Sequence, residues 1–149
     1  MAEPNAFPDY AGDLSVKDGW ALLENEPGAQ LVDVRTTAEW AFVGLPDLSS
    51  LRRAAHCTEW QVFPGMAVNP DFTARVAAQL RAAGATDDTA VLFLCRSGAR
   101  SRAAAIALTE AGFRRAYNLA GGFEGDVDSE GHRSRRNGWK AAGLPWRQT

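Results

Sequence analysis

Cysteine and histidine are scarce in this sequence, which contains two of each. These four residues lack the close spacing of a zinc motif, so we expect no metal and no other cofactor. The sequence starts without an export signal, and we therefore expect Cys57 and Cys95 to be reduced thiols rather than a structural disulfide. At least one of them is then a candidate for chemistry.

Long apolar segments are also absent. The start of the sequence has neither a basic region nor an apolar stretch, and no later run approaches the roughly 18 apolar residues that a membrane span needs. We therefore expect a soluble cytoplasmic protein without a membrane partner. The sequence holds no internal repeat, and its length suits one domain over residues 1–149, with a loose N-terminal segment at 1–12.

Neither sign of charge dominates the chain, whose formal net charge is −2. The two parts differ, because residues 1–94 hold 6 basic and 13 acidic side chains, whereas residues 95–149 hold 10 basic and 5 acidic ones. The basic part would attract a small anion if it surrounds a reactive site, although a mixed solvated surface has the same composition. The acids interleaved with these basic residues argue against nucleic acid as a partner.

Helix and strand patterns alternate along the chain. Ser15 with Asp18 and Thr36 with Glu39 have the spacing of helix N-caps, and Asn69 followed by proline predicts a further helix start. The predicted strands lie at residues 31–34, 54–57, 91–94 and 115–119. The strand at 91–94 is apolar at every position, as a strand buried on both faces requires. This order predicts an α/β fold with a central, mainly parallel sheet flanked by helices on both faces.

A cysteine follows the strand at 91–94 and begins the stretch CRSGARS. Ligands of open parallel sheets bind beyond the carboxyl ends of the strands, where Cys95 falls. Free backbone amides and the positive end of the following helix favour the thiolate, which is the reactive form. Gly98 lets the loop fold tightly, and Arg96 and Arg100 offer donors for a tetrahedral oxyanion. The stretch predicts Cys95 as the nucleophile and, as substrate-binding residues, Arg96, Ser97, Gly98, Ala99, Arg100 and Ser101.

Other interpretations of the two cysteines stay open at this point. Cys95 could be a small buried residue at a strand end, which is common for free cysteine. Cys57 lies in the irregular middle of the chain, and its candidate role is to pair with Cys95 on oxidation.

Three segments together resemble the rhodanese family of single-domain sulfurtransferases, namely LVDVRTTAEW, CRSGARS and NLAGGFEG. The family's Asp-x-Arg with a following glutamate is matched by Asp33, Arg35 and Glu39, and its Gly-Gly-aromatic turn by residues 121–123. The ending WKAAGLPW resembles a bacterial subgroup of small rhodanese-like proteins. The resemblance implies a rhodanese-like fold and spans nearly the whole chain.

The resemblance also implies a transfer of sulfane sulfur. Cys95 would take the outer sulfur of thiosulfate or a similar anionic donor, release sulfite and hold the sulfur as a persulfide. Cyanide, a thiol or a sulfur-carrier protein would then accept it. Arg96 or Arg100 would hold the sulfonate end of the donor, while Asp33 and Arg35 would support the loop.

Two segments depart from the family pattern. Many rhodaneses carry Gly-His-Ile-Pro-Gly-Ala before the middle strand, whereas this chain has GLPDLSSLRRAAH, so one pocket wall is expected to differ in shape. The segment at 126–138, DVDSEGHRSRRNG, is longer than a turn needs. We predict an ordinary surface loop there, with a lid or a docking surface for an acceptor protein as alternatives.

Two other functions remain as alternatives. Phosphatases and arsenate reductases of related fold grip an oxyanion with a loop of cysteine, five residues and arginine. Four residues separate Cys95 from Arg100 here, and Ser101 holds the position of the phosphatase arginine. This shorter loop suits sulfur better than a phosphoryl group. A non-catalytic rhodanese-like interaction module is the second alternative, and an intact cysteine argues against it.

Overall fold

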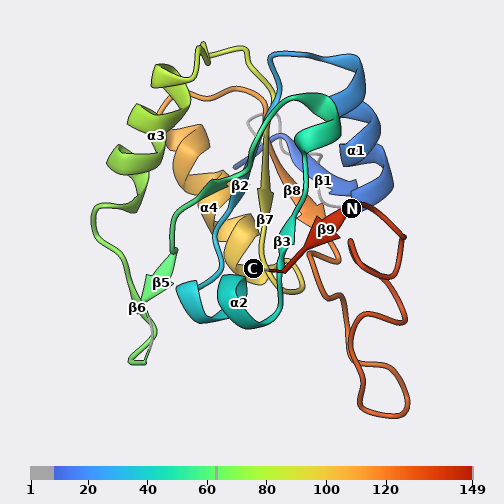
Figure 1. Cartoon of the computed structure of the whole chain (residues 1–149). Helices are drawn as coiled ribbons and strands as arrows, with labels where there is room; N and C mark the ends of the chain where they lie inside the picture. The colour runs from blue at the N-terminus through green and yellow to red at the C-terminus, as the bar shows by residue number, and fades with distance from the viewer. Residues whose placement is uncertain (1–8, 63, 149) are drawn as a thin grey trace, which may run out of the picture.

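Five parallel strands form the central sheet of the computed structural model, which describes residues 9–62 and 64–148 (Figure 1). The strands lie in the order β1-β8-β7-β2-β4 across the sheet. Their bounds are β1 Gly12–Ser15, β2 Gln30–Asp33, β4 His56–Cys57, β7 Val91–Leu94 and β8 Ala116–Ala120. The parallel pairing confirms the predicted type of sheet and places the strand at 91–94 in its centre.

Helices cover both faces of this sheet, as the sequence pattern predicted. They are α1 Val16–Asn25, α2 Thr37–Phe42, the 3-10 helix η1 Ser49–Leu51, α3 Phe72–Ala82 and α4 Ala99–Glu110. In Figure 1, α3 and α4 lie on one side of the sheet and α1 lies on the other. Within the described residues, no helix is long and apolar enough to cross a membrane.

Side chains of β7 and the residue after it divide between two parts of the core. Val91, Phe93 and Cys95 pack with buried residues of α3 and α4, whereas Leu92 and Leu94 pack with α1 and the C-terminal segment. Each of these side chains is 1% exposed or less. Successive side chains of a strand point to opposite faces, so a strand covered on both faces is apolar throughout. This burial fixes the end of β7, where the loop at Cys95 begins.

Two helices begin where the capping pairs predicted. Ser15 Oγ accepts a hydrogen bond from the Asp18 amide at 3.0 Å and caps α1. At α2, Thr36 and Glu39 form a full capping box, in which each side chain bonds to the backbone of the other residue. The box also holds the Glu39 carboxylate in place, which matters for the site described below.

The helix α3 begins later than the sequence predicted. Its N-cap is Asp71 and not Asn69. Asn69 instead closes the preceding turn, because its Oδ1 accepts from the Asp71 amide at 3.1 Å and its own amide donates to the Trp60 carbonyl at 2.8 Å. These contacts hold Asn69 outside the helix.

The prediction of a loose segment at 1–12 is wrong for its last residues, while residues 1–8 lie outside the described part of the chain. Tyr10 packs against the core, and the Ala11 amide donates to the Ala116 carbonyl at 2.9 Å. Gly12 then opens β1, which pairs with β8. A short edge strand depends on its partner strand rather than on its own residues, and so leaves little pattern in the sequence.

Two short antiparallel pairs complete the fold. β3 (Leu45–Pro46) pairs with β9 (Trp146–Arg147), which brings the C-terminal segment beside the chain that follows α2. β5 (Gln61–Val62) and β6 (Ala67–Val68) form a hairpin before α3. The sequence predicted neither pair, because each strand has only two residues.

His56 gives the stability of the fold a pH dependence. Its Nε2 lies 2.6 Å from Oε1 of Gln30, and burial lowers the pKa of His56 below the ordinary value of 6.5. The folded state therefore favours the neutral imidazole, and the stability it contributes is present above pH 6.5 and is lost as the pH falls below that value.

Urea denaturation at pH 7 and pH 5 measures this contribution. We expect the neutral His56 to account for a loss of less than about 1 kcal/mol, since the ring is partly exposed to solvent. The variant His56→Gln is expected to show a smaller loss than the parent protein. An equal loss in both proteins would show that His56 is not the group responsible.

Candidate active site

Cys95 is the first residue after β7 and precedes α4 at the carboxyl edge of the sheet. Its side chain is 1% exposed. The Gly98 amide donates to the Cys95 sulfur at 3.1 Å, and the Ser101 hydroxyl lies 3.2 Å from it. Gly98 has a φ of 123°, a conformation that favours glycine. The sulfur thus lies at the positive end of a twelve-residue helix, which favours the thiolate.

The Gly-Gly-Phe turn after β8 fixes the backbone of this loop. The Phe123 amide donates to the Cys95 carbonyl at 2.8 Å, and the Glu124 amide donates to the Arg96 carbonyl at 3.0 Å. Gly122 has a φ of 62°, and a Cβ there would lie 2.5 Å from the Cys95 carbonyl oxygen. Only glycine allows so close an approach of the two backbone segments.

A cavity of about 410 Å³ opens at Cys95. Among the predicted substrate-binding residues, four line this cavity, namely Arg96, Ser97, Ala99 and Arg100. Gly98 and Ser101 do not line it and instead contact the sulfur directly. The volume suits a small molecule, and the nucleophile lies in its wall.

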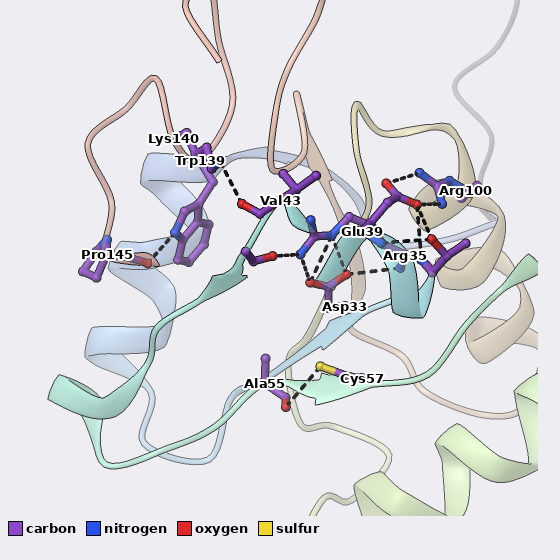
Figure 2. A network of polar contacts seen from close by, with 12 residues as sticks. Asp33, Arg35, Glu39, Val43, Ala55, Cys57, Arg100, Trp139, Lys140 and Pro145 are labelled. Carbon is purple, nitrogen blue, oxygen red and sulfur yellow. Dashed lines mark hydrogen bonds and ion pairs between the residues drawn. The ribbon is translucent and has the colours of Figure 1, made fainter. Parts of the chain in front are cut away.

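Arg100 is committed to Glu39 (Figure 2). Its Nη1 lies 2.7 Å from Oε1 and its Nη2 lies 3.0 Å from Oε2 of that carboxylate. Burial alone would raise the pKa of Glu39, but the hydrogen bond and charge of Arg100 outweigh it and hold the pKa below its usual value. Two parallel hydrogen bonds fix the guanidinium and offset most of its charge. Arg100 therefore shapes the cavity more than it attracts an anion.

Arg96 is placed differently from Arg100. It is exposed and lines the cavity. Within residues 9–62 and 64–148, no carboxylate lies at ion-pair distance from its guanidinium. An unneutralised guanidinium beside a cysteine is an anion-binding group with forked donors. The choice between Arg96 and Arg100, which the sequence left open, therefore favours Arg96.

Asp33 and Arg35 form a buried ion pair at the end of β2 (Figure 2). Arg35 Nη2 lies 2.6 Å from Asp33 Oδ2, and both side chains are 0% exposed. Arg35 also donates to the Gly44 carbonyl at 2.8 Å and lies over the Phe123 ring, 4.2 Å from its centroid. Neither residue lines the cavity. The pair contacts the segments that hold the loop, and not the space that a ligand would occupy.

Cys57 is not brought next to Cys95. It ends β4, and β2 lies between β4 and β7. Two strand spacings place the two α-carbons about 10 Å apart, beyond the roughly 7 Å that a disulfide allows. Although part of the residue is exposed, burial of the thiol and the nearby Asp33 carboxylate raise the pKa of Cys57 to about 11. The suggested pairing on oxidation is therefore wrong for this structure, and Cys57 is a weakly reactive thiol.

The segment 126–138 contains neither helix nor strand. It folds back on itself, since the Ser134 amide donates to the Glu124 carbonyl and the Asp126 amide donates to Asn137 Oδ1 at 2.7 Å. None of its residues lines the cavity at Cys95. The structure thus favours the predicted surface loop over a lid.

Sequence reasoning missed three residues that line the cavity: Glu39, which it only matched to the family pattern, and the pair Gln61 and Met66. This pair belongs to the β5–β6 hairpin region. The hairpin reaches the site because Glu59 just before it accepts from the Thr37 amide at 3.0 Å, at the start of α2. This contact joins residues 22 positions apart, and no local pattern in the sequence announces it. The segment at 44–56, where the sequence departs from the family pattern, does not line this cavity.

Known proteins resemble this chain in sequence and structure. A family model described as the STR4 middle domain matches residues 11–149. The crystal structure of Rv0390 from M. tuberculosis is 49% identical, has a TM-score of 0.82, and covers 94% of this chain and 99% of its own.

Two further proteins match this chain by sequence, each over most of both chains. The uncharacterized protein RP600 of Rickettsia prowazekii (strain Madrid E) is 36% identical over 125 residues, which are 84% of this chain and 86% of the relative. The thiosulfate sulfurtransferase GlpE of Actinobacillus pleuropneumoniae is 28% identical over 133 residues, which are 89% of this chain and 90% of the relative.

Proposed function

Because the chain belongs to the rhodanese-like family, we propose that it is a sulfurtransferase that carries sulfane sulfur as a persulfide on Cys95. The observation that carries this proposal is the position of the Cys95 sulfur. The sulfur lies in the wall of a small-molecule cavity and accepts a hydrogen bond from the Gly98 amide. Arg96, which forms no ion pair with a carboxylate in the described part of the chain, lines the same cavity. The sulfurtransferase name of a relative that matches nearly full length supports the same chemistry.

The proposed reaction has two steps at the same sulfur. The Cys95 thiolate attacks the outer sulfur of thiosulfate, a new S–S bond forms, and the bond to the sulfonate sulfur breaks with its electron pair leaving on sulfite. A nucleophilic acceptor such as cyanide or a thiol then attacks the terminal sulfur of the persulfide. Thiocyanate or an acceptor persulfide leaves, and the Cys95 thiolate is restored. The chemistry needs no metal and no cofactor.

The loop suits each anion in this cycle. Backbone donors and the α4 dipole face the thiolate and the persulfide without having to move, which is how preorganised sites stabilise charge. Arg96 would hold the sulfonate of the donor, while Arg100 stays fixed by Glu39. A sulfur-carrier protein is a further candidate acceptor, and a cytoplasmic location would keep Cys95 reduced between turnovers.

Arg96→Ala tests the role of Arg96 in donor binding. We expect it to raise the KM for thiosulfate by roughly tenfold or more, since a hydrogen bond to a charged group contributes about 1.5–3 kcal/mol. The matched control is Arg102→Ala, because Arg102 is also exposed but does not line the cavity. Steady-state kinetics with thiosulfate and cyanide measure both variants. Equal KM values for the two would remove Arg96 from donor binding.

The function is tested by two assays on the same protein preparation. In the first, thiosulfate and cyanide are supplied and thiocyanate is measured. In the second, p-nitrophenyl phosphate is supplied and its hydrolysis is measured. We expect thiocyanate and no hydrolysis. Hydrolysis without thiocyanate would assign a phosphatase, and the absence of both reactions with a folded protein would favour a non-catalytic interaction module.

A further inference from the structure

A series of polar side chains runs from the surface to the sulfur of Cys95. Asp13 Oδ1 accepts from Asn118 Nδ2 at 3.0 Å, and Asn118 Oδ1 lies 2.5 Å from the Ser101 hydroxyl. That hydroxyl lies 3.2 Å from the sulfur. Asp13 is exposed, whereas Asn118 is 4% exposed and Ser101 is 0% exposed. β1, β8 and α4 thus each contribute one residue to a route that ends at the nucleophile.

The carboxylate of Asp13 fixes the order of these hydrogen bonds. An ionised carboxylate only accepts, so the amide nitrogen of Asn118 faces Asp13 and the amide oxygen faces Ser101. Ser101 has one hydroxyl proton, and the Asn118 oxygen is its nearest acceptor, ahead of the Gly98 carbonyl and the sulfur, each at 3.2 Å. A hydroxyl that donates to Asn118 turns a lone pair toward the sulfur. A lone pair suits a neutral S–H donor and opposes a thiolate.

Building on the proposed sulfur transfer at Cys95, we propose that Asp13 and Asn118 are positioning residues that hold the Ser101 hydroxyl away from the sulfur while this sulfur is uncharged. When Cys95 ionises, its proton passes to water, and the hydroxyl leaves Asn118 to donate to the thiolate. After sulfur transfer the negative charge lies on the outer sulfur of the persulfide. The inner sulfur is then neutral, and the hydroxyl returns to Asn118.

The Ser101 hydroxyl held by Asn118 opposes the groups that favour the Cys95 thiolate. The Gly98 amide and the α4 dipole stabilise a charged sulfur, whereas the positioned hydroxyl favours an uncharged one. A thiol that ionises at higher pH gives a thiolate of higher intrinsic nucleophilicity. The Asp13 and Asn118 pair therefore trades a smaller thiolate fraction for a thiolate of higher intrinsic nucleophilicity.

The charged groups at the cavity are Arg96, Arg100 and Glu39, which lie on the loop, α4 and α2. Arg102 of α4 lies over the Tyr10 ring, 5.6 Å from its centroid. On the β1 side, the Tyr10 hydroxyl donates to Asp13 Oδ1 at 2.9 Å. None of these contacts replaces the hydrogen bond between Asp13 and Asn118.

The pH profile of Cys95 alkylation by iodoacetamide tests the proposal in a Cys57→Ser background, where Cys95 is the remaining thiol. Asp13→Ala is expected to lower the midpoint of the profile by about half a pH unit. The reason is that Asn118 can then turn its nitrogen toward Ser101, which frees the hydroxyl for the thiolate. Asp13→Asn is expected to keep the parent midpoint, because its amide oxygen still accepts from Asn118.

Asn118→Leu supplies the second arm of the test. In that background Asp13→Ala is expected to cause no further shift, whereas a through-space effect of the lost charge would persist. Equal shifts for Asp13→Ala and Asp13→Asn, a shift that persists beside Asn118→Leu, or no shift at all would overturn the proposal. Asp13 is exposed, so its variants are expected to fold, and they decide the matter alone if Asn118→Leu does not fold. Alkylation needs no sulfur donor, so a failed transfer assay with the expected midpoints would refute the proposed function and not the positioning.

Discussion

Cys95→Ser is expected to lose thiocyanate formation by more than about a thousandfold, because a serine hydroxyl cannot carry the transferred sulfur as a persulfide. The matched control is Cys57→Ser, which removes the other thiol of the chain. This variant is expected to keep the parent rate, since Cys57 lies two strands from β7 and its pKa of about 11 keeps it protonated at neutral pH. Initial rates with thiosulfate and cyanide compare the two variants.

The pair of variants separates the nucleophile from a general need for thiols. Thermal unfolding of each protein shows that the loss is not one of folding. A Cys95→Ser protein that still forms thiocyanate above the rate without protein would remove Cys95 from the reaction. A loss of activity in Cys57→Ser alone would assign the chemistry to Cys57, at the end of β4, and not to Cys95.

Asp33→Ala is expected to lower the free energy of unfolding by about 3–5 kcal/mol, because it leaves the Arg35 guanidinium buried without its counter-charge. Both side chains are 0% exposed, and the remaining contact of Arg35 with the Gly44 carbonyl does not neutralise it. Domains of this size are stable by about 5–15 kcal/mol, so the loss removes a large share of the total. Urea denaturation measures the difference.

Two further proteins sharpen this experiment. The double variant Asp33→Leu with Arg35→Met removes both charges and is expected to recover much of the loss, as apolar replacements of buried ion pairs do. Asp87→Ala breaks the Arg81 pair, whose side chains are 46% and 48% exposed, and is expected to cost far less than Asp33→Ala. Similar losses for Asp33→Ala and Asp87→Ala would show that the buried pair is not a main support of the fold.

Local patterns predicted the parts of the fold that depend on neighbours in sequence. The capping pairs gave the starts of α1 and α2, because a cap bonds to an amide three residues away. The apolar run before Cys95 predicted a strand buried on both faces, and the glycine and arginines after it predicted the loop. Each of these features lies within one turn or one strand, so the local sequence permits few other backbone conformations there.

Contacts between distant segments could not be predicted in the same way. The pairing of Arg100 with Glu39 spans 61 positions, and it decides which arginine is free to meet an anion. The hydrogen bond from Asn118 to Asp13 spans 105 positions and depends on the pairing of β1 with β8. The edge strand β1 and the β5–β6 hairpin are short, so their places are set by the segments they contact and not by their own composition.

The intact mass of the protein after incubation with thiosulfate tests the persulfide on Cys95 most directly. The parent protein is expected to gain one sulfur atom, about 32 Da, and to lose it again when cyanide is added. Cys95→Ser is expected to gain nothing. A folded parent protein whose mass stays unchanged with thiosulfate and with polysulfide, or a gain that persists in Cys95→Ser, would contradict sulfur transfer through Cys95.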